Sequence, residues 1–287
     1  MVAVAIATDT AIYQEDSVIR VVKERFIKST DPRFFESQKE SWSSPPIDGV
    51  GYIPSADLLK KSDTELRAII EQLERERYNV NGWRNHQNKW RKLLGLDETR
   101  GKVVLDYGCG CGVEALQFAK TGNRVMVMDI AEGNVELTGR VLGLYGHKPY
   151  LSICLSYGGF SFSGRHCRPI DVFYCNGVLH HIPYARDVLR WAAESLAPDG
   201  EIRLMLYSDI GWKISTETKE APPVEEDVET NPLFRKFTST FDYVGCYADW
   251  YSADKLRHRF GDFLELVSFD YICSDNAYCV AILRRKS

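Results

Sequence analysis

Four short segments carry residue types that could bind a ligand or move a proton, and each lies at the end of a predicted strand or helix. The first is the loop 106–112, Asp-Tyr-Gly-Cys-Gly-Cys-Gly. Its alternate glycines would let the backbone approach a ligand closely, and the next helix would offer N–H groups there. A dinucleotide-binding loop places its third glycine one residue beyond Gly112, at Val113. The early glycine and the leading Asp106 therefore favour a nucleoside with a short amino-acid tail over a pyrophosphate.

The other three segments follow in chain order. Asp129 ends the next predicted strand, where a carboxylate can accept hydrogen bonds from ribose hydroxyls or cap the following helix. Residues 175–182, Cys-Asn-Gly-Val-Leu-His-His-Ile, end the fourth strand. His180 or His181 could take a proton from an acceptor hydroxyl or amine, although helix capping or ligand contact would explain the pair equally well. Residues 195–201 stop a helix and lead into the fifth strand.

Alternating strands and helices position these segments. The predicted strands are 102–107, 124–130, 150–156, 170–175 and 201–207, and the helices between them are 113–120, 134–144 and 185–196. This alternation indicates a parallel sheet with helices on both faces. A helix at 252–260 and strands at 264–272 and 277–283 follow, and the short turn between these two strands predicts an antiparallel hairpin.

The flanking segments have less regular patterns. Ser62 and Glu65 predict a capping box at the start of a helix over 62–78, and further helices are expected over 16–28 and 82–96. An aromatic stretch between the fifth strand and the last hairpin could be a substrate lid or a hydrophobic cover. If it is a lid, Tyr243, Tyr247 and Trp250 are the candidate substrate-binding residues.

Taken in order and spacing, the four segments resemble the class I S-adenosylmethionine (SAM)-dependent methyltransferases, particularly the branch that acts on small molecules. The resemblance covers residues 101–207 and, more loosely, the last strands. It implies a Rossmann-like, doubly wound α/β sheet of seven strands with the last one antiparallel. We accordingly divide the chain into an N-terminal cap segment, 1–98, and a SAM-binding methyltransferase domain, 99–287, in which 209–251 is a substrate-side insertion.

The resemblance also implies residue roles. The glycine loop would lie under the methionine portion of SAM, Asp106 would bind its amino group, Asp129 its ribose, and Ile130 would pack on the adenine. The backbone of Asn176 and Gly177 would lie near the methionine end. The implied cofactor-binding set is Asp106, Tyr107, Gly108, Cys109, Gly110, Gly112, Asp129, Ile130, Asn176 and Gly177.

One departure from the family concerns the adenine. Residues 156–160, Ser-Tyr-Gly-Gly-Phe, follow the third strand, where the family often has an acidic residue near the adenine amine. The adenine contacts are therefore left open. His181 and His180 remain the candidate catalytic residues, since a base is needed only if the acceptor loses a proton.

The predicted reaction is an in-line displacement that moves the methyl group of SAM to O or N of a small or medium-sized acceptor and leaves S-adenosyl-L-homocysteine. A catalytically inactive SAM-binding regulatory or scaffold subunit is the alternative, and the glycine spacing disfavours a nicotinamide oxidoreductase. A net charge of -4 argues against a nucleic-acid partner unless residues 84–92 form a basic face.

Composition limits the setting of the protein. No apolar run is long enough to cross a bilayer, which predicts no membrane partner. The eight cysteines show no metal-binding spacing, and those in strand-like segments read as small reduced hydrophobes. A cytoplasmic location is therefore expected. The sequence gives no oligomeric state.

Overall fold

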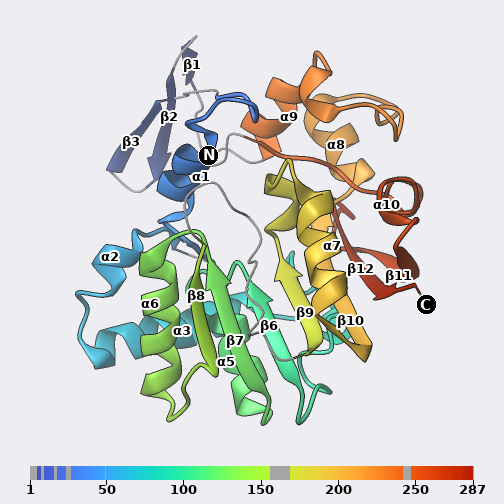
Figure 1. Cartoon of the computed structure of the whole chain (residues 1–287). Helices are drawn as coiled ribbons and strands as arrows, with labels where there is room; N and C mark the ends of the chain where they lie inside the picture. Colours follow the sequence, from blue (N-terminus) through green and yellow to red (C-terminus); the bar gives the residue numbers. More distant parts are fainter. Residues whose placement is uncertain are drawn as a thin grey trace.

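A sheet of seven strands forms the centre of the computed structural model (Figure 1). The structure describes residues 27–48, 50–155, 169–240 and 247–286, and the backbone alone of 5–7, 10–15, 18–23 and 241. In order, the strands of this sheet are β11 (Leu264–Ile272), β12 (Tyr278–Arg285), β10 (Leu196–Tyr207), β9 (Ile170–Asn176), β6 (Val103–Tyr107), β7 (Arg124–Asp129) and β8 (Leu151–Cys154). β12 is antiparallel to both neighbours, and the pairs from β10 to β8 are parallel. The predicted Rossmann-like α/β fold is confirmed.

Helices cover both faces of the sheet, so its central strands are apolar on both sides. All of β6 is buried, and its residues alternate between two cores. Val104 packs in the core of one set of helices: α3 (Asp63–Arg77), α4 (Lys89–Leu93), α5 (Val113–Lys120) and α6 (Glu132–Leu144). Val103 and Leu105 pack in the core of the other set: α7 (Ala185–Ser195), α8 (Asp209–Thr216), α9 (Phe234–Phe241) and α10 (Ala253–Phe260).

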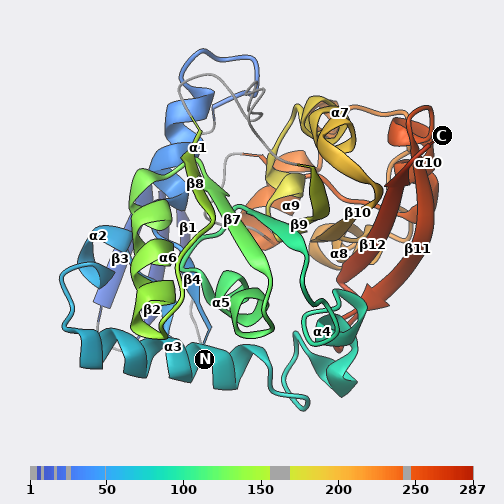
Figure 2. The same cartoon turned by 60° about the horizontal axis from the view of Figure 1, so that its bottom comes forward.

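From residue 34 on, the segment before the sheet contains α1 (Phe34–Trp42), a pair of short strands, β4 (Pro46–Ile47) and β5 (Gly51–Tyr52), and α2 (Ser55–Leu58). It leads into α3, which starts with the predicted capping box. The N–H of Glu65 donates to Ser62 Oγ at 3.3 Å, and Glu65 Oε2 accepts from the N–H of Ser62 at 2.8 Å. α3 runs beneath α5 and α6 in Figure 2 and contacts both.

Two helices predicted in the N-terminal segment are wrong. Over 82–96 the chain forms a loop, one 3-10 turn at His86–Asn88 and the short α4. The Asn85 side chain explains this break, because it donates to Tyr78 O at 2.9 Å and accepts from the Arg91 N–H at 3.1 Å, competing with helical bonds.

In the described part of 16–28, a strand at 18–23 replaces the predicted helix. β3 (Val18–Lys23) pairs with β2 (Thr10–Glu15), which pairs with β1 (Ala5–Ala7), and both pairs are antiparallel. The sequence of β3, Val-Ile-Arg-Val-Val-Lys, is dominated by β-branched residues, which favour a strand.

The segment between β10 and α10 contains α8, a 3-10 turn at Val228–Thr230 and α9. Its last part, 247–251, lies against the end of β10, where Tyr251 forms a parallel bridge with Ser208. Nowhere in the described ranges is there a helix both long enough and apolar enough to cross a membrane.

Candidate active site

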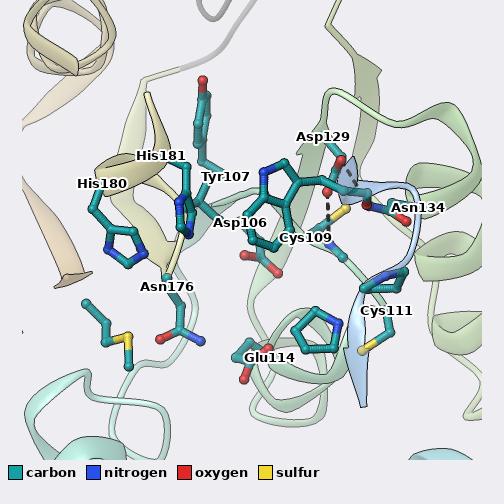
Figure 3. Close-up of a pocket in the computed structure, with 18 of the residues that line it drawn as sticks. Asp106, Tyr107, Cys109, Cys111, Glu114, Asp129, Asn134, Asn176, His180 and His181 are labelled. Atoms are coloured by element: carbon teal, nitrogen blue, oxygen red, sulfur yellow. Dashed lines mark hydrogen bonds between the residues drawn. The ribbon is translucent and has the colours of Figure 1, made fainter. Parts of the chain in front are cut away.

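A cavity of about 410 Å³ lies at the carboxyl ends of β6, β7, β9 and β10, where open α/β sheets bind ligands (Figure 3). Most of the predicted cofactor residues line it: Asp106, Tyr107, Gly108, Cys109, Gly110, Asp129, Ile130, Asn176 and Gly177. His180 and His181 line it as well. Figure 3 shows Asp129 and Asn134 on one side, the histidines on the other, and Asp106 between them.

The glycine loop is hydrogen-bonded to the end of β7. The N–H groups of Gly108 and Cys109 donate to Met128 O at 2.7 and 3.1 Å. Gly108 has a φ of 81°, and a Cβ there would lie 2.3 Å from a Val178 methyl carbon. Gly112 does not line the cavity; a Cβ on it would lie 2.8 Å from Thr138, so its role is to let α5 start close to α6.

Asp106 carries an unsatisfied buried oxygen. Its side chain is only 2% exposed, and Oδ2 has no hydrogen-bond partner among the described residues. Burial raises the pKa of this carboxyl well above its usual range, with Glu114 and Asp129 adding to the effect. A buried acceptor without a partner is costly, so a cationic donor from a ligand would be stabilised there. The α-amino group of SAM fits this requirement.

Asp129 is oriented by its own loop and by α6. Its Oδ2 accepts from the Gly110 N–H at 3.0 Å, and Oδ1 accepts from the Ala131 N–H at 2.9 Å and from Asn134 Nδ2 at 3.1 Å. Burial raises the pKa of Asp129 to about 6. Asp129 thus caps the turn into α6 and also presents a fixed carboxylate to the cavity, so the two roles considered for it are compatible.

Asn134 was missed by the sequence reasoning. Besides Asp129, it donates to Trp42 O at 2.9 Å and accepts from Ser55 Oγ. One buried amide therefore ties the N-terminal segment to the residue expected to bind the ribose. An asparagine in the first turn of a helix carries no sequence signal for such a role.

The two histidines have different tautomers, set by the backbone. His181 Nδ1 lies 3.0 Å from Tyr247 O, and a carbonyl only accepts, so Nδ1 carries the proton and Nε2 is the basic nitrogen. His180 Nδ1 accepts from the Tyr207 N–H at 3.1 Å, so its proton lies on Nε2. Burial and the neighbouring His181 lower the pKa of His180 well below its usual range. Only His181 therefore has the arrangement of a general base.

A buried charged cluster borders the cavity near the glycine loop. Arg77 pairs with Glu114 at 2.8 Å and with Asp48 at 2.7 Å, and Arg84 Nη2 lies 3.4 Å from Asp48. Burial alone would raise the pKa of Asp48, but the positive charges of Arg77 and Arg84 outweigh it and lower this pKa to about 2. Arg84 Nε is buried without a hydrogen-bond partner among the described residues. A carboxylate such as that of methionine would satisfy it.

Cys109 and Cys111 line the cavity as thiols. Burial raises the pKa of Cys111 to about 11, although Arg77 opposes the shift, and burial raises the pKa of Cys109 well above its usual range. Neither side chain is therefore an activated nucleophile at neutral pH.

The histidine side of the cavity is aromatic. The His181 ring lies 4.6 Å from Trp42 and 5.4 Å from Tyr207, measured between centroids. Tyr207 lies 5.3 Å from Tyr278, which lies 5.4 Å from Trp83. These rings come from α1, β10, β12 and the loop before α4, so only the fold brings them together.

The predicted substrate residues lie elsewhere. Tyr243 is outside the described residues. Tyr247 and Trp250 are 3% and 2% exposed, and neither lines the cavity. Tyr247 packs against Phe34 and Phe234, and Trp250 lies under Lys255 Nζ at 4.0 Å. They belong to the core behind the histidines because their large apolar rings are more stable there than at a solvated mouth.

Solved structures share this architecture. A SAM-dependent methyltransferase from Clostridium acetobutylicum superposes with a TM-score of 0.50 at 11% identity, over 78% of this chain and 99% of that one. A protein from Pyrococcus horikoshii gives 0.50 at 14% identity, over 72% and 93%. These likenesses show the fold, which is that of the class I SAM-dependent methyltransferases, as predicted.

The family follows from the sequence match. A family model described as a methyltransferase domain matches residues 78–263, more than half of the chain. The chain belongs to this methyltransferase-domain family. The matched residues include the glycine loop, Asp129 and both histidines.

Curated relatives are similar over a shorter stretch. The ubiquinone biosynthesis O-methyltransferase of Salmonella paratyphi A is 29% identical over 103 residues, 36% of this chain and 41% of that protein. The mitochondrial ubiquinone biosynthesis O-methyltransferase of Schizosaccharomyces pombe is 31% identical over 109 residues, 38% and 39%. The chain thus spans about two-fifths of the length of these relatives.

Proposed function

We propose that this protein transfers the methyl group of SAM to a hydroxyl oxygen of a small aromatic molecule and releases S-adenosyl-L-homocysteine. The observation that carries the proposal is a single cavity that joins a glycine loop with two buried carboxylates to an aromatic wall holding the basic nitrogen of His181. The O-methyltransferase names of the curated relatives support oxygen as the acceptor atom.

The residues at the carboxylate end fit SAM. Asp106 would bind the amino group, Arg84 the carboxylate, and Asp129 the ribose, while Gly108 and Gly110 leave room for the methionine chain. When bound, SAM supplies an electrophilic methyl carbon on a positively charged sulfur. The protein then has to hold the acceptor oxygen in line with that carbon, at roughly 3–3.5 Å.

His181 removes the proton that the acceptor hydroxyl must lose. As the new O–CH3 bond forms and the C–S bond breaks, that proton passes to His181 Nε2. His180 keeps its own proton on Nε2 and can only donate a hydrogen bond at neutral pH. The surrounding rings exclude water and would stack on a flat acceptor.

Two alternatives lose support. A nucleic-acid acceptor needs a basic face over 84–92, but Arg84, Lys89 and Arg91 form ion pairs with acidic side chains at 3.4, 3.7 and 2.6 Å. An inactive SAM-binding subunit has no need of a histidine held as a base inside the cavity. The described site has both features that turnover requires, residues that fit SAM and a base beside the cavity.

The proposal includes the division of the chain. Residues 1–98 act as a cap, which is supported by the contacts of Trp42 and Ser55 with Asn134. Residues 99–287 form the SAM-binding domain, with 209–251 inserted on the acceptor side, where Tyr247 supports His181. A cytoplasmic location is proposed as well, and the buried free thiols are consistent with a reducing compartment.

Calorimetric titration with SAM and S-adenosyl-L-homocysteine tests the cofactor half. We expect saturable binding that Asp129→Ala abolishes and that the control Asp262→Ala, at an exposed ion pair, retains. A phenol and catechol library assayed for S-adenosyl-L-homocysteine release tests the acceptor half. His181→Gln should bind SAM normally and lose about 10²–10⁴-fold in kcat. Binding without turnover of any phenol would reject the aromatic acceptor, and no binding would reject the whole proposal.

A further inference from the structure

The segment that fixes the His181 tautomer is itself fastened to the site by backbone hydrogen bonds. In this strap, residues 247–251, Tyr247 O accepts from His181 Nδ1. The Asp249 N–H donates to His180 O at 2.8 Å, and the Tyr251 N–H donates to Tyr207 O at 2.8 Å. The strap therefore sets both the ring orientation of His181 and the path of the histidine turn.

The strap is anchored in turn by a buried ionic cluster. The Asp249 side chain is 2% exposed, and its Oδ1 accepts from Lys255 Nζ at 2.7 Å and from the Trp250 N–H at 2.8 Å. Its Oδ2 accepts from Arg259 Nη1. Lys255 is also buried, with a side chain 1% exposed. Both cations come from one face of α10, outside the cavity described above.

We infer that Asp249, held by Lys255 and Arg259, is a positioning residue that keeps His181 in the tautomer protonated on Nδ1. This inference rests on the proposed role of His181 as the base. A buried lysine is expensive to desolvate and would not be retained for packing alone, since an apolar side chain of similar volume is often at least as stable. What the ion pair adds is a fixed position for the Asp249 backbone, which contacts His180 and lies two residues from the carbonyl that holds His181.

The geometry allows little freedom in how the anchor acts. Asp249 touches His180 through its N–H and lies two residues from the carbonyl that holds His181. If its carboxylate loses a cation, it must move toward solvent, and the strap must move with it. Tyr247 O then leaves Nδ1, and the proton can pass to Nε2, where it blocks proton acceptance.

The test uses Lys255→Met and Asp249→Asn in the full chain, with Arg203→Met as control. Arg203 is also a largely buried cation paired with a carboxylate, Glu201, but it lies outside the cavity and the strap. Histidine labelled with ¹⁵N reports the tautomer of each ring, and His181→Gln identifies the His181 signals. Thermal denaturation measures the stability lost by each variant.

We expect the wild-type protein and Arg203→Met to show His181 protonated on Nδ1. In Lys255→Met and Asp249→Asn, a signal from the Nε2 tautomer should appear and kcat should fall at least about tenfold, because a positioned base contributes about 10²–10⁴-fold. SAM affinity should stay at the wild-type value. Should Lys255→Met not fold, Arg259→Gln removes the more exposed cation and serves the same purpose.

The outcomes separate this inference from the proposed function. If His181→Gln retains wild-type kcat, the base assignment fails and the positioning role fails with it. If His181→Gln is inactive but Asp249→Asn and Lys255→Met keep the Nδ1 tautomer and wild-type kcat, only the positioning role is overturned. A loss of stability without a change in tautomer, as in the control, would mean that the cluster is merely structural.

Discussion

Replacing Asp129 by asparagine should change how stability depends on pH in the absence of SAM. The carboxyl is 6% exposed, and burial raises its pKa from 3.8 to about 6 despite hydrogen bonds from Ala131, Gly110 and Asn134. Between those values the folded protein binds a proton that the unfolded chain does not. The free energy of unfolding that Asp129 controls therefore falls as pH rises through this window.

The size of the effect follows from the two pKa values. One pH unit corresponds to 1.36 kcal/mol, so the window from 3.8 to about 6 corresponds to about 3 kcal/mol. The Asp129 carboxyl destabilises the folded protein least below about pH 4 and most above about pH 6, where it is ionised in both states. His180 acts in the opposite direction, because its pKa is lowered. The quantity to measure is thus the difference between wild type and Asp129→Asn, which cancels His180.

Urea denaturation from about pH 4 to about pH 7 measures this difference. We expect the stability of wild type relative to Asp129→Asn to drop by about 3 kcal/mol across the range, mostly between pH 4 and 6. Asp262→Asn, at an exposed carboxyl whose pKa is lowered, should give a flat difference over the same range. A flat difference for Asp129→Asn would refute the assignment of a buried, proton-binding carboxyl at this position.

Three further predictions follow from the same site. Gly108→Ala should weaken SAM binding, measured by calorimetry, and destabilise the fold by about 1–3 kcal/mol, measured by thermal denaturation, because the new Cβ meets Val178. The double variant Gly108→Ala/Val178→Ala should recover part of the lost affinity and part of the lost stability. Asn134→Ala should raise the Kd for SAM about tenfold by losing charge-assisted and buried hydrogen bonds, while Asn123→Ala, away from the cavity, should not. In native protein, a thiol reagent should modify the exposed Cys154 well before Cys111, whose pKa is about 11; equal rates would contradict the buried loop.

The sheet could be predicted because its signals are local. Strands β6, β7 and β9 are largely apolar runs beside a turn, and the hairpin of β11 and β12 has a short turn between its two strands. The glycine loop, Asp129 and the histidine pair each follow a strand, and the carboxyl ends of parallel strands must share one edge. Their convergence on one cavity therefore follows from chain order alone.

The acceptor half could not be predicted for the opposite reason. Only tertiary packing brings Trp42, Trp83, Tyr207 and Tyr278 to one cavity, and an aromatic residue in sequence looks the same in a core or in a cavity. This ambiguity is why Tyr247 and Trp250 were assigned to the substrate, although they pack behind the histidines. The histidine tautomers likewise depend on backbone groups far away in the sequence, such as Tyr247 O.

The depth gradient of the cavity has a kinetic consequence. The carboxylates expected to hold the cofactor, Asp106 and Asp129, are 2% and 6% exposed, and His181 is 5% exposed, whereas Trp83 in the aromatic wall is 47% exposed. A molecule seated at the exposed end would obstruct the deeper one. We expect compulsory-order turnover, in which the nucleoside enters first and departs last. We expect the escape of the nucleoside, next to the hydrogen bond from Asn134 to Trp42 O, to limit the steady-state rate more than the methyl transfer itself.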